Sequence, residues 1–201
     1  MGSFDDRAAG WDSDPAKVAR AREVAEAVAA AVPLDPGLRL LEYGAGTGLV
    51  SEALGRRVGA ATLADSSAGM RAVLVEKVAS GRFPGGRVWD LDLETDDVPS
   101  ARFDLAVASL VLHHVRELDR VLAGLSRLLA PGGHLCVADL DRTEGGTFHR
   151  HDVDTHDGFD RAELAARLER AGLVDVGVRD CGAVERDGVA HPVFLAVARR
   201  P

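Results

Sequence analysis

"RLLEYGAGTGLVSEAL", residues 39–54, places three alternating glycines between two apolar runs. The run before the glycines predicts a buried strand over residues 38–43, and the run after them predicts a helix over residues 49–58. Glycines at such a strand-to-helix turn let a ligand approach the backbone N–H groups. Their spacing is G-x-G-x-G, which matches neither the dinucleotide pattern G-x-G-x-x-G nor a phosphate-binding loop that ends in G-K-[ST].

Strands and helices alternate along the rest of the chain. Helical patterns cover residues 15–32, 67–80, 117–130 and 160–173. Strand patterns cover residues 60–65 and 86–93. A further strand begins at residue 103, and another follows a turn within residues 131–140. Asp14 and Asp160 are predicted to cap the first and last of these helices. Two final runs, residues 174–181 and 191–200, predict an antiparallel hairpin. This order predicts an α/β fold with a parallel sheet covered on both faces, and ligands bind such sheets beyond the carboxyl ends of the strands.

The composition favours one globular domain and argues against several classes of partner. The 201 residues have 46% hydrophobic side chains, a formal charge of −8 and a pI of about 5.3. The acidic balance, without a basic patch, disfavours a nucleic-acid substrate. No apolar run reaches the length of a membrane helix, and the acidic N-terminal stretch differs from a signal peptide. With two dispersed cysteines, these features predict a cytoplasmic protein without membrane partners.

Two aspartates extend the glycine pattern into a nucleoside site. Asp65 closes the second predicted strand, and Asp92 closes the third. A carboxylate at the first position can accept hydrogen bonds from both hydroxyls of a ribose, and one at the second can receive an exocyclic amine of adenine. Each aspartate alone could instead be a helix cap or a surface acid. Because the glycines, Asp65 and Asp92 follow one another on three successive strand ends, the set favours a nucleoside cofactor.

At these residues the chain resembles the class I S-adenosylmethionine-dependent methyltransferases. The matching stretches are "LLEYGAGTG", "LADSSAGM", "VWDLDLE", "FDLAVASLVLHHV" and "LLAPGGHLCVADL", followed by the last helix and the hairpin. The resemblance implies a doubly wound, Rossmann-like sheet of seven strands in the order 3-2-1-4-5-7-6, with strand 7 antiparallel and helices on both faces. It also implies an S-adenosyl-L-methionine cofactor, with S-adenosyl-L-homocysteine as the product.

The resemblance also assigns parts of the chain and single residues. Within one domain of residues 1–201, it implies an N-terminal lid and helix (1–36), a cofactor-binding core (37–140), a substrate-side loop (141–158) and a C-terminal helix and hairpin (159–201). The residues implied to contact the cofactor are Glu42, Tyr43, Gly44, Ala45, Gly46, Gly48, Asp65, Ser66, Met70, Asp92, Leu93 and Ser109. For Met70, a place in the apolar core is an open alternative.

Candidate groups for the acceptor side come from three places in the sequence. The resemblance implies that Trp11 is a lid residue, although it could instead anchor the first helix. It also implies that Leu110, directly after the fourth strand, lines the space between cofactor and substrate. His113 and His114 are candidate bases for a substrate that must lose a proton. The stretch "TFHRHDVDTHDGF", residues 147–159, is expected to lie over the active site; its histidines are His149, His151 and His156. That stretch lacks known metal-ligand spacing, and no metal is expected.

The predicted reaction is methyl transfer by in-line displacement to a small-molecule acceptor, mainly through proximity and alignment. Two alternatives stay open: a protein that binds S-adenosylmethionine or S-adenosylhomocysteine without catalysis, and a protein methyltransferase. The glycine spacing disfavours an NAD-dependent reductase. The acceptor atom and the oligomeric state are left open.

Overall fold

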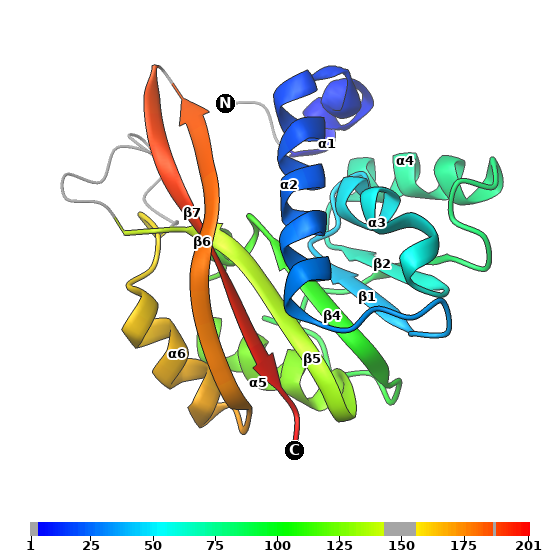
Figure 1. Ribbon diagram of the computed structural model, residues 1–201. Helices are drawn as coiled ribbons and strands as arrows, with labels where there is room; N and C mark the ends of the chain where they lie inside the picture. The colour runs from blue at the N-terminus through cyan, green and yellow to red at the C-terminus, as the bar shows by residue number, and fades with distance from the viewer. Residues whose placement is uncertain (1–3, 143–155, 187) are drawn as a thin grey trace.

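The computed structural model describes residues 4–142, 156–186 and 188–201. Within these residues, seven strands form one sheet in the order β3-β2-β1-β4-β5-β7-β6, which confirms the predicted topology (Figure 1). The strands are β1 (Leu40–Tyr43), β2 (Ala61–Asp65), β3 (Arg87–Asp90), β4 (Phe103–Ser109), β5 (Leu129–Leu140), β6 (Val174–Arg186) and β7 (Val189–Arg199). Strand β7 runs antiparallel to both of its neighbours, and the pairs among β1 to β5 are parallel.

Five helices lie where the apolar periodicity predicts them, with shorter bounds, and one further short helix precedes them. They are α1 (Phe4–Arg7), α2 (Pro15–Ala31), α3 (Leu49–Leu54), α4 (Ala68–Ala79), α5 (Leu118–Leu128) and α6 (Arg161–Arg170), with short 3-10 turns at Ala8–Ser13, Gly55–Arg57 and Leu112–His114. Both predicted caps are confirmed. The carboxylate of Asp14 accepts from the N–H of Ala16 at 2.9 Å, and that of Asp160 accepts from the N–H of Glu163 at 2.9 Å.

Two apolar layers cover the sheet. Successive residues of a strand point to opposite faces, so Leu40 joins the cluster under α2, α3 and α4, whereas Leu41 joins the cluster under α5 and α6. Cys136 on β5 is completely buried in the first cluster, and burial raises the pKa of its thiol to about 12. This cysteine therefore acts as a small apolar residue, as predicted.

Strand β3 is shorter than its sequence pattern. It ends at Asp90, because the chain turns out of the sheet directly afterwards. The backbone carbonyl of Asp92 accepts hydrogen bonds from the N–H groups of Thr95 and Asp96, and its side chain accepts from the N–H of Glu94. Asp92 thus lies in a turn two residues beyond the strand.

No helix in the described part of the chain is long and apolar enough to cross a membrane.

Candidate functional site

A cavity of about 270 Å³ opens at the carboxyl ends of β1, β2 and β4. Most of the residues predicted for the site line it. They are Trp11, Glu42, Tyr43, Gly44, Ala45, Gly46, Asp65, Ser66, Met70, Asp92, Ser109, Leu110 and His114. This is the edge of a parallel sheet at which ligands bind, so the fold brings together residues from six separate elements of the sequence.

The three glycines of the loop serve different purposes. Gly44, Gly46 and Gly48 all have positive φ angles, of 65°, 56° and 80°. A Cβ on Gly44 would lie 2.2 Å from a methyl carbon of Val111, whereas a Cβ on Gly46 would meet no atom within 4 Å. Gly46 therefore presents bare backbone to open space in the cavity.

Gly48 differs from its predicted role. It caps the start of α3, and a Cβ there would lie 2.9 Å from side-chain atoms of both Leu74 and Phe83. It does not line the cavity. This glycine therefore allows close contact between α3 and the layer around α4, whereas Gly44 and Gly46 line the cavity.

Asp65 closes β2 and fixes the glycine loop. One carboxylate oxygen accepts the N–H of Gly46 at 2.7 Å, and the other accepts the N–H of Ser67 at 2.8 Å. Burial raises the pKa of Asp65, although both hydrogen bonds act in the opposite direction. Each oxygen has a second lone pair, so the carboxylate can still accept two hydroxyl groups of a ligand.

Glu42 lies at the base of the cavity and is almost completely buried. Its carboxylate accepts the N–H of Ser51 at 3.0 Å. Burial raises its pKa to about 7, with the hydrogen bonds from Ser51 and the positive charge of Lys77 acting in the opposite direction. The cavity floor therefore holds a carboxyl group whose charge changes near neutral pH.

The residues predicted around the adenine divide into two groups. Ser66, Met70 and Asp92 line the cavity, and Met70 is also 99% buried, so the core and the cofactor interpretations of this side chain are compatible. Leu93, in contrast, does not line the cavity. Its side chain is buried in the core, and its N–H donates to the hydroxyl of Tyr43 at 3.2 Å. The turn after β3 therefore places Asp92 in the cavity wall and Leu93 in the apolar core.

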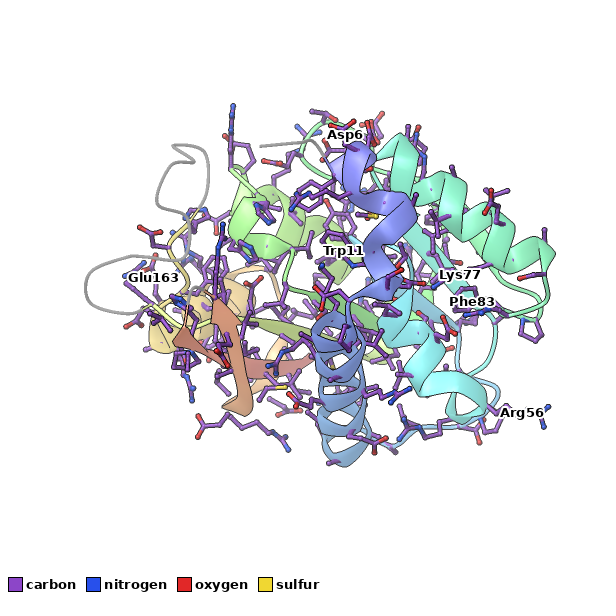
Figure 2. All side chains as sticks on the ribbon, turned by 90° about the horizontal axis from the view of Figure 1, so that it is seen from above. Asp6, Trp11, Arg56, Lys77, Phe83 and Glu163 are labelled. Carbon is purple, nitrogen blue, oxygen red and sulfur yellow. The ribbon has the colours of Figure 1, made fainter. Side chains whose placement is uncertain are left out.

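The N-terminal segment, residues 4–13, forms one wall of the cavity. Trp11 and Phe4 both line it, with ring centroids 6.2 Å apart, and the ammonium of Lys17 lies 4.5 Å from the centre of the indole ring. Figure 2 shows this segment, with Trp11 labelled, alongside α4. Asp5 connects the two, because its carboxylate accepts from the N–H of Gly69 at 2.8 Å. Trp11 thus lies in a wall of the cavity, and its role as a lid stays a prediction.

The two adjacent histidines have different surroundings. His113 is 98% buried, and its Nδ1 lies 2.6 Å from the carboxylate of Asp139. The same carboxylate accepts the N–H groups of Leu112 and Leu140 at 2.9 and 2.8 Å. His113 therefore belongs to a buried network that shapes the loop after β4, and it does not line the cavity. The prediction that His113 acts as a base is not supported by this position, because the ring lies in the buried network and not in the cavity wall.

His114 does line the cavity, and the ring of Phe4 lies edge-on to it with centroids 5.3 Å apart. Leu110, between β4 and this turn, has a φ of 51°, which is strained for a leucine. Its N–H donates to the carbonyl of Ala138 at 2.8 Å. Strained backbone of this kind is frequent at ligand-binding sites, and here it places Leu110 in the cavity wall as predicted.

The predicted substrate loop is described only in part. His149 and His151 lie outside the described residues. His156 does not line the cavity: its N–H donates to the carbonyl of His113 at 2.7 Å, and its Nε2 lies 3.0 Å from the carbonyl of Val115. Among the residues that the structure describes, no three His, Cys, Asp or Glu side chains form a metal-binding group.

Sequence analysis missed several lining residues, among them Phe4, Lys17, Arg20, Thr47, Glu94, Val111 and Val115. Lys17 and Arg20 are three positions apart on α2, which places two cations on one face of the helix. Arg20 donates to Glu23 and to the carbonyl of Cys181, and its Nε is buried without a hydrogen-bond partner among the described residues. The three-residue spacing of Lys17 and Arg20 was the sequence signal that could have identified this basic face of α2.

Comparisons with known proteins agree with this geometry. Residues 17–178 match a family model described as a methyltransferase domain. An uncharacterized methyltransferase of Schizosaccharomyces pombe is 37% identical over 158 residues, which cover 71% of this chain and 55% of the relative. The chain thus spans about half the length of that relative. The chain belongs to the methyltransferase domain family, within the class I S-adenosylmethionine-dependent methyltransferases.

Solved structures share the fold at low sequence identity. The N-methyltransferase NodS of Bradyrhizobium japonicum, in complex with S-adenosylhomocysteine, has a TM-score of 0.72 and 20% identity, with 94% of this chain and 90% of NodS covered. A methyltransferase from a complex with the Haloferax volcanii activator Trm112 has a TM-score of 0.80 and 18% identity, with 100% and 99% covered. At these identities the likeness establishes the fold alone.

Proposed function

We propose that this chain binds S-adenosylmethionine in the cavity and transfers its methyl group to a small-molecule acceptor. The observation that carries the proposal is the contact between Asp65 and the N–H of Gly46 at the open part of the cavity. It sets a carboxylate beside bare loop backbone, the combination that a nucleoside with an attached amino acid requires. When bound, the cofactor supplies a methyl group activated by a positively charged sulfur, which a nucleophile can take by in-line displacement at carbon.

In this proposal the chain binds and orients the cofactor with residues of both charges. Asp65 accepts hydrogen bonds from the ribose hydroxyls, and Asp92 receives the amine of the adenine. Lys17 and Arg20 bring two cations to the cavity wall, where they attract a carboxylate. Holding the reacting atoms in line contributes most of the rate enhancement, because the leaving group needs no protonation.

The acceptor side consists of Phe4, Trp11, Leu110 and His114 in this proposal. The two aromatic rings exclude water and offer apolar contact to a small acceptor. His114 can take a proton from an acceptor that must lose one, since its ring lines the cavity. His113 instead positions the turn that carries His114, through its bond to Asp139.

Titration calorimetry with S-adenosylmethionine, S-adenosylhomocysteine and NAD⁺ tests the cofactor. We expect the first two to bind and NAD⁺ not to bind. Replacing Asp65→Ala should weaken binding by about 1.5–3 kcal/mol, the usual value for hydrogen bonds to a charged group. Asp90→Ala is the matched control, because Asp90 pairs in register with Asp65 on β3, is exposed and does not line the cavity. Equal affinities for the two variants would refute the ribose assignment.

Turnover distinguishes an enzyme from a non-catalytic binder. The purified chain is incubated with S-adenosylmethionine and a panel of small hydroxyl, amine and carbon acids, and S-adenosylhomocysteine is measured. Acceptor-dependent formation of S-adenosylhomocysteine supports the proposal. Formation that depends on added protein substrates alone would favour a protein methyltransferase.

A further inference from the structure

Lys77 of α4 is a buried lysine whose ammonium joins three separate elements. It is 7% exposed, and its Nζ donates to the carbonyl of Thr47 at 2.8 Å, to Glu52 at 3.1 Å and to Asp12 at 2.6 Å. Thr47 belongs to the glycine loop, Glu52 to α3 and Asp12 to the N-terminal segment. The three N–H groups of the ammonium therefore have three acceptors from three parts of the fold.

A second contact closes this network. The hydroxyl of Thr47 donates to the other carboxylate oxygen of Asp12 at 2.5 Å. Asp12 thus binds the glycine loop directly through Thr47 and indirectly through Lys77. Thr47 lies between Gly46 and Gly48, and Asp12 follows Trp11, so the network connects two walls of the cavity.

The charges make this connection strong. A buried ammonium is costly unless carboxylates and hydrogen bonds compensate it. Glu52 also binds Arg82, so part of its charge is shared with a second cation. If the N-terminal segment moved away, Lys77 would lose Asp12 and keep only the shared carboxylate and one carbonyl. The ammonium of Lys77 therefore favours the closed position of the N-terminal segment.

We propose that Lys77 is a positioning residue that latches the N-terminal segment, residues 4–13, over the cavity and fixes the glycine loop beneath the cofactor. This inference rests on the proposed function, because the walls that it joins are those assigned to S-adenosylmethionine. Figure 2 shows the labelled Lys77 on α4 beside the segment that carries Trp11. Closure of the N-terminal segment is then coupled to the cofactor-binding conformation of the glycine loop.

Hydrogen exchange and S-adenosylhomocysteine binding test the latch on the full chain. Asp12→Asn removes the charge of the segment, and we expect exchange of the amides of residues 4–13 to rise about tenfold without ligand, with affinity for S-adenosylhomocysteine about tenfold weaker. Glu52→Gln is the matched control, since it removes a carboxylate from the same ammonium outside the segment. It should leave exchange of residues 4–13 within twofold of the original chain.

A second variant tests whether Asp12 acts through Lys77. In Lys77→Met, the further change Asp12→Asn should have less than a threefold effect on either measurement. If Lys77→Met does not fold, the comparison of Asp12→Asn with Glu52→Gln decides alone. Unchanged exchange in Asp12→Asn, or equal effects of the two carboxylate changes, would overturn the proposal. If the original chain does not bind S-adenosylhomocysteine, the proposed function fails, while ligand-free exchange still tests the latch.

Discussion

Replacing the buried Glu42 with glutamine should change how the stability of the protein depends on pH. In the folded chain, burial raises the pKa of this carboxyl from 4.5 to about 7. Between these pH values the folded state therefore holds a proton that the unfolded state has released. Because the folded state binds more protons, the free energy of unfolding falls as pH rises through this range.

The size of the effect follows from the same pKa. Each pH unit between the two pKa values corresponds to about 1.4 kcal/mol, which gives a total of about 3.5 kcal/mol. Glutamine at position 42 can still accept the N–H of Ser51 but does not ionise. Between pH 5 and pH 8, the original chain should therefore lose about 2.5 kcal/mol of stability relative to Glu42→Gln. Below about pH 3.5 the difference between the two chains should be constant, because the carboxyl is then protonated in both the folded and the unfolded state.

Urea unfolding at a series of pH values measures this difference directly. The comparison between two chains cancels the titration of all other groups. Glu163→Gln is a suitable control, because Glu163 is exposed and Arg167 holds its pKa below the ordinary value. The difference in stability between this control and the original chain should therefore stay constant across the same pH range. Curves for Glu42→Gln and the original chain that run parallel from pH 5 to pH 8 would refute the burial argument.

Two further substitutions probe the loop and the buried network. Gly44→Ala should destabilise the fold by about 3 kcal/mol or more, because the added Cβ would collide with Val111 and the φ of this position is positive. Thermal unfolding measures this loss. Gly46→Ala should cost only about 1 kcal/mol of stability while weakening S-adenosylhomocysteine binding in calorimetry; equal stability losses for the two glycines would contradict the assignment. Asp139→Asn should cost about 3 kcal/mol in urea unfolding, because the buried ring of His113 loses its carboxyl partner. An unchanged unfolding midpoint would show that this contact does not stabilise the fold.

The fold was predictable because its signals are local. Apolar runs that end in glycine or aspartate mark β1 and β2, and Asp14 and Asp160 cap the helices that they precede. These features depend on residues a few positions apart. The order of the strands came from the family resemblance, since neither periodicity nor capping specifies which strands are neighbours.

The roles of single residues were less predictable because they depend on distant parts of the chain. Gly46 and Gly48 look equivalent in sequence, yet Leu74 and Phe83 fill the space beside one of them only. Lys77 looks like an ordinary lysine in the last turn of a helix. Its burial follows from Asp12, which lies 65 positions earlier in the sequence.

The position of His113 beside His114 affects how mutational data on this chain should be interpreted. Both rings follow β4, but one is buried against Asp139 and the other lines the cavity. If the proposed function holds, loss of either ring should lower methyl transfer, for His113 through a distorted turn and for His114 through the lost contact with the acceptor. In a screen that scores activity alone, the two histidines would form one apparent catalytic pair. Recording the unfolding temperature of each variant in the same screen would separate a scaffold defect from a chemical one.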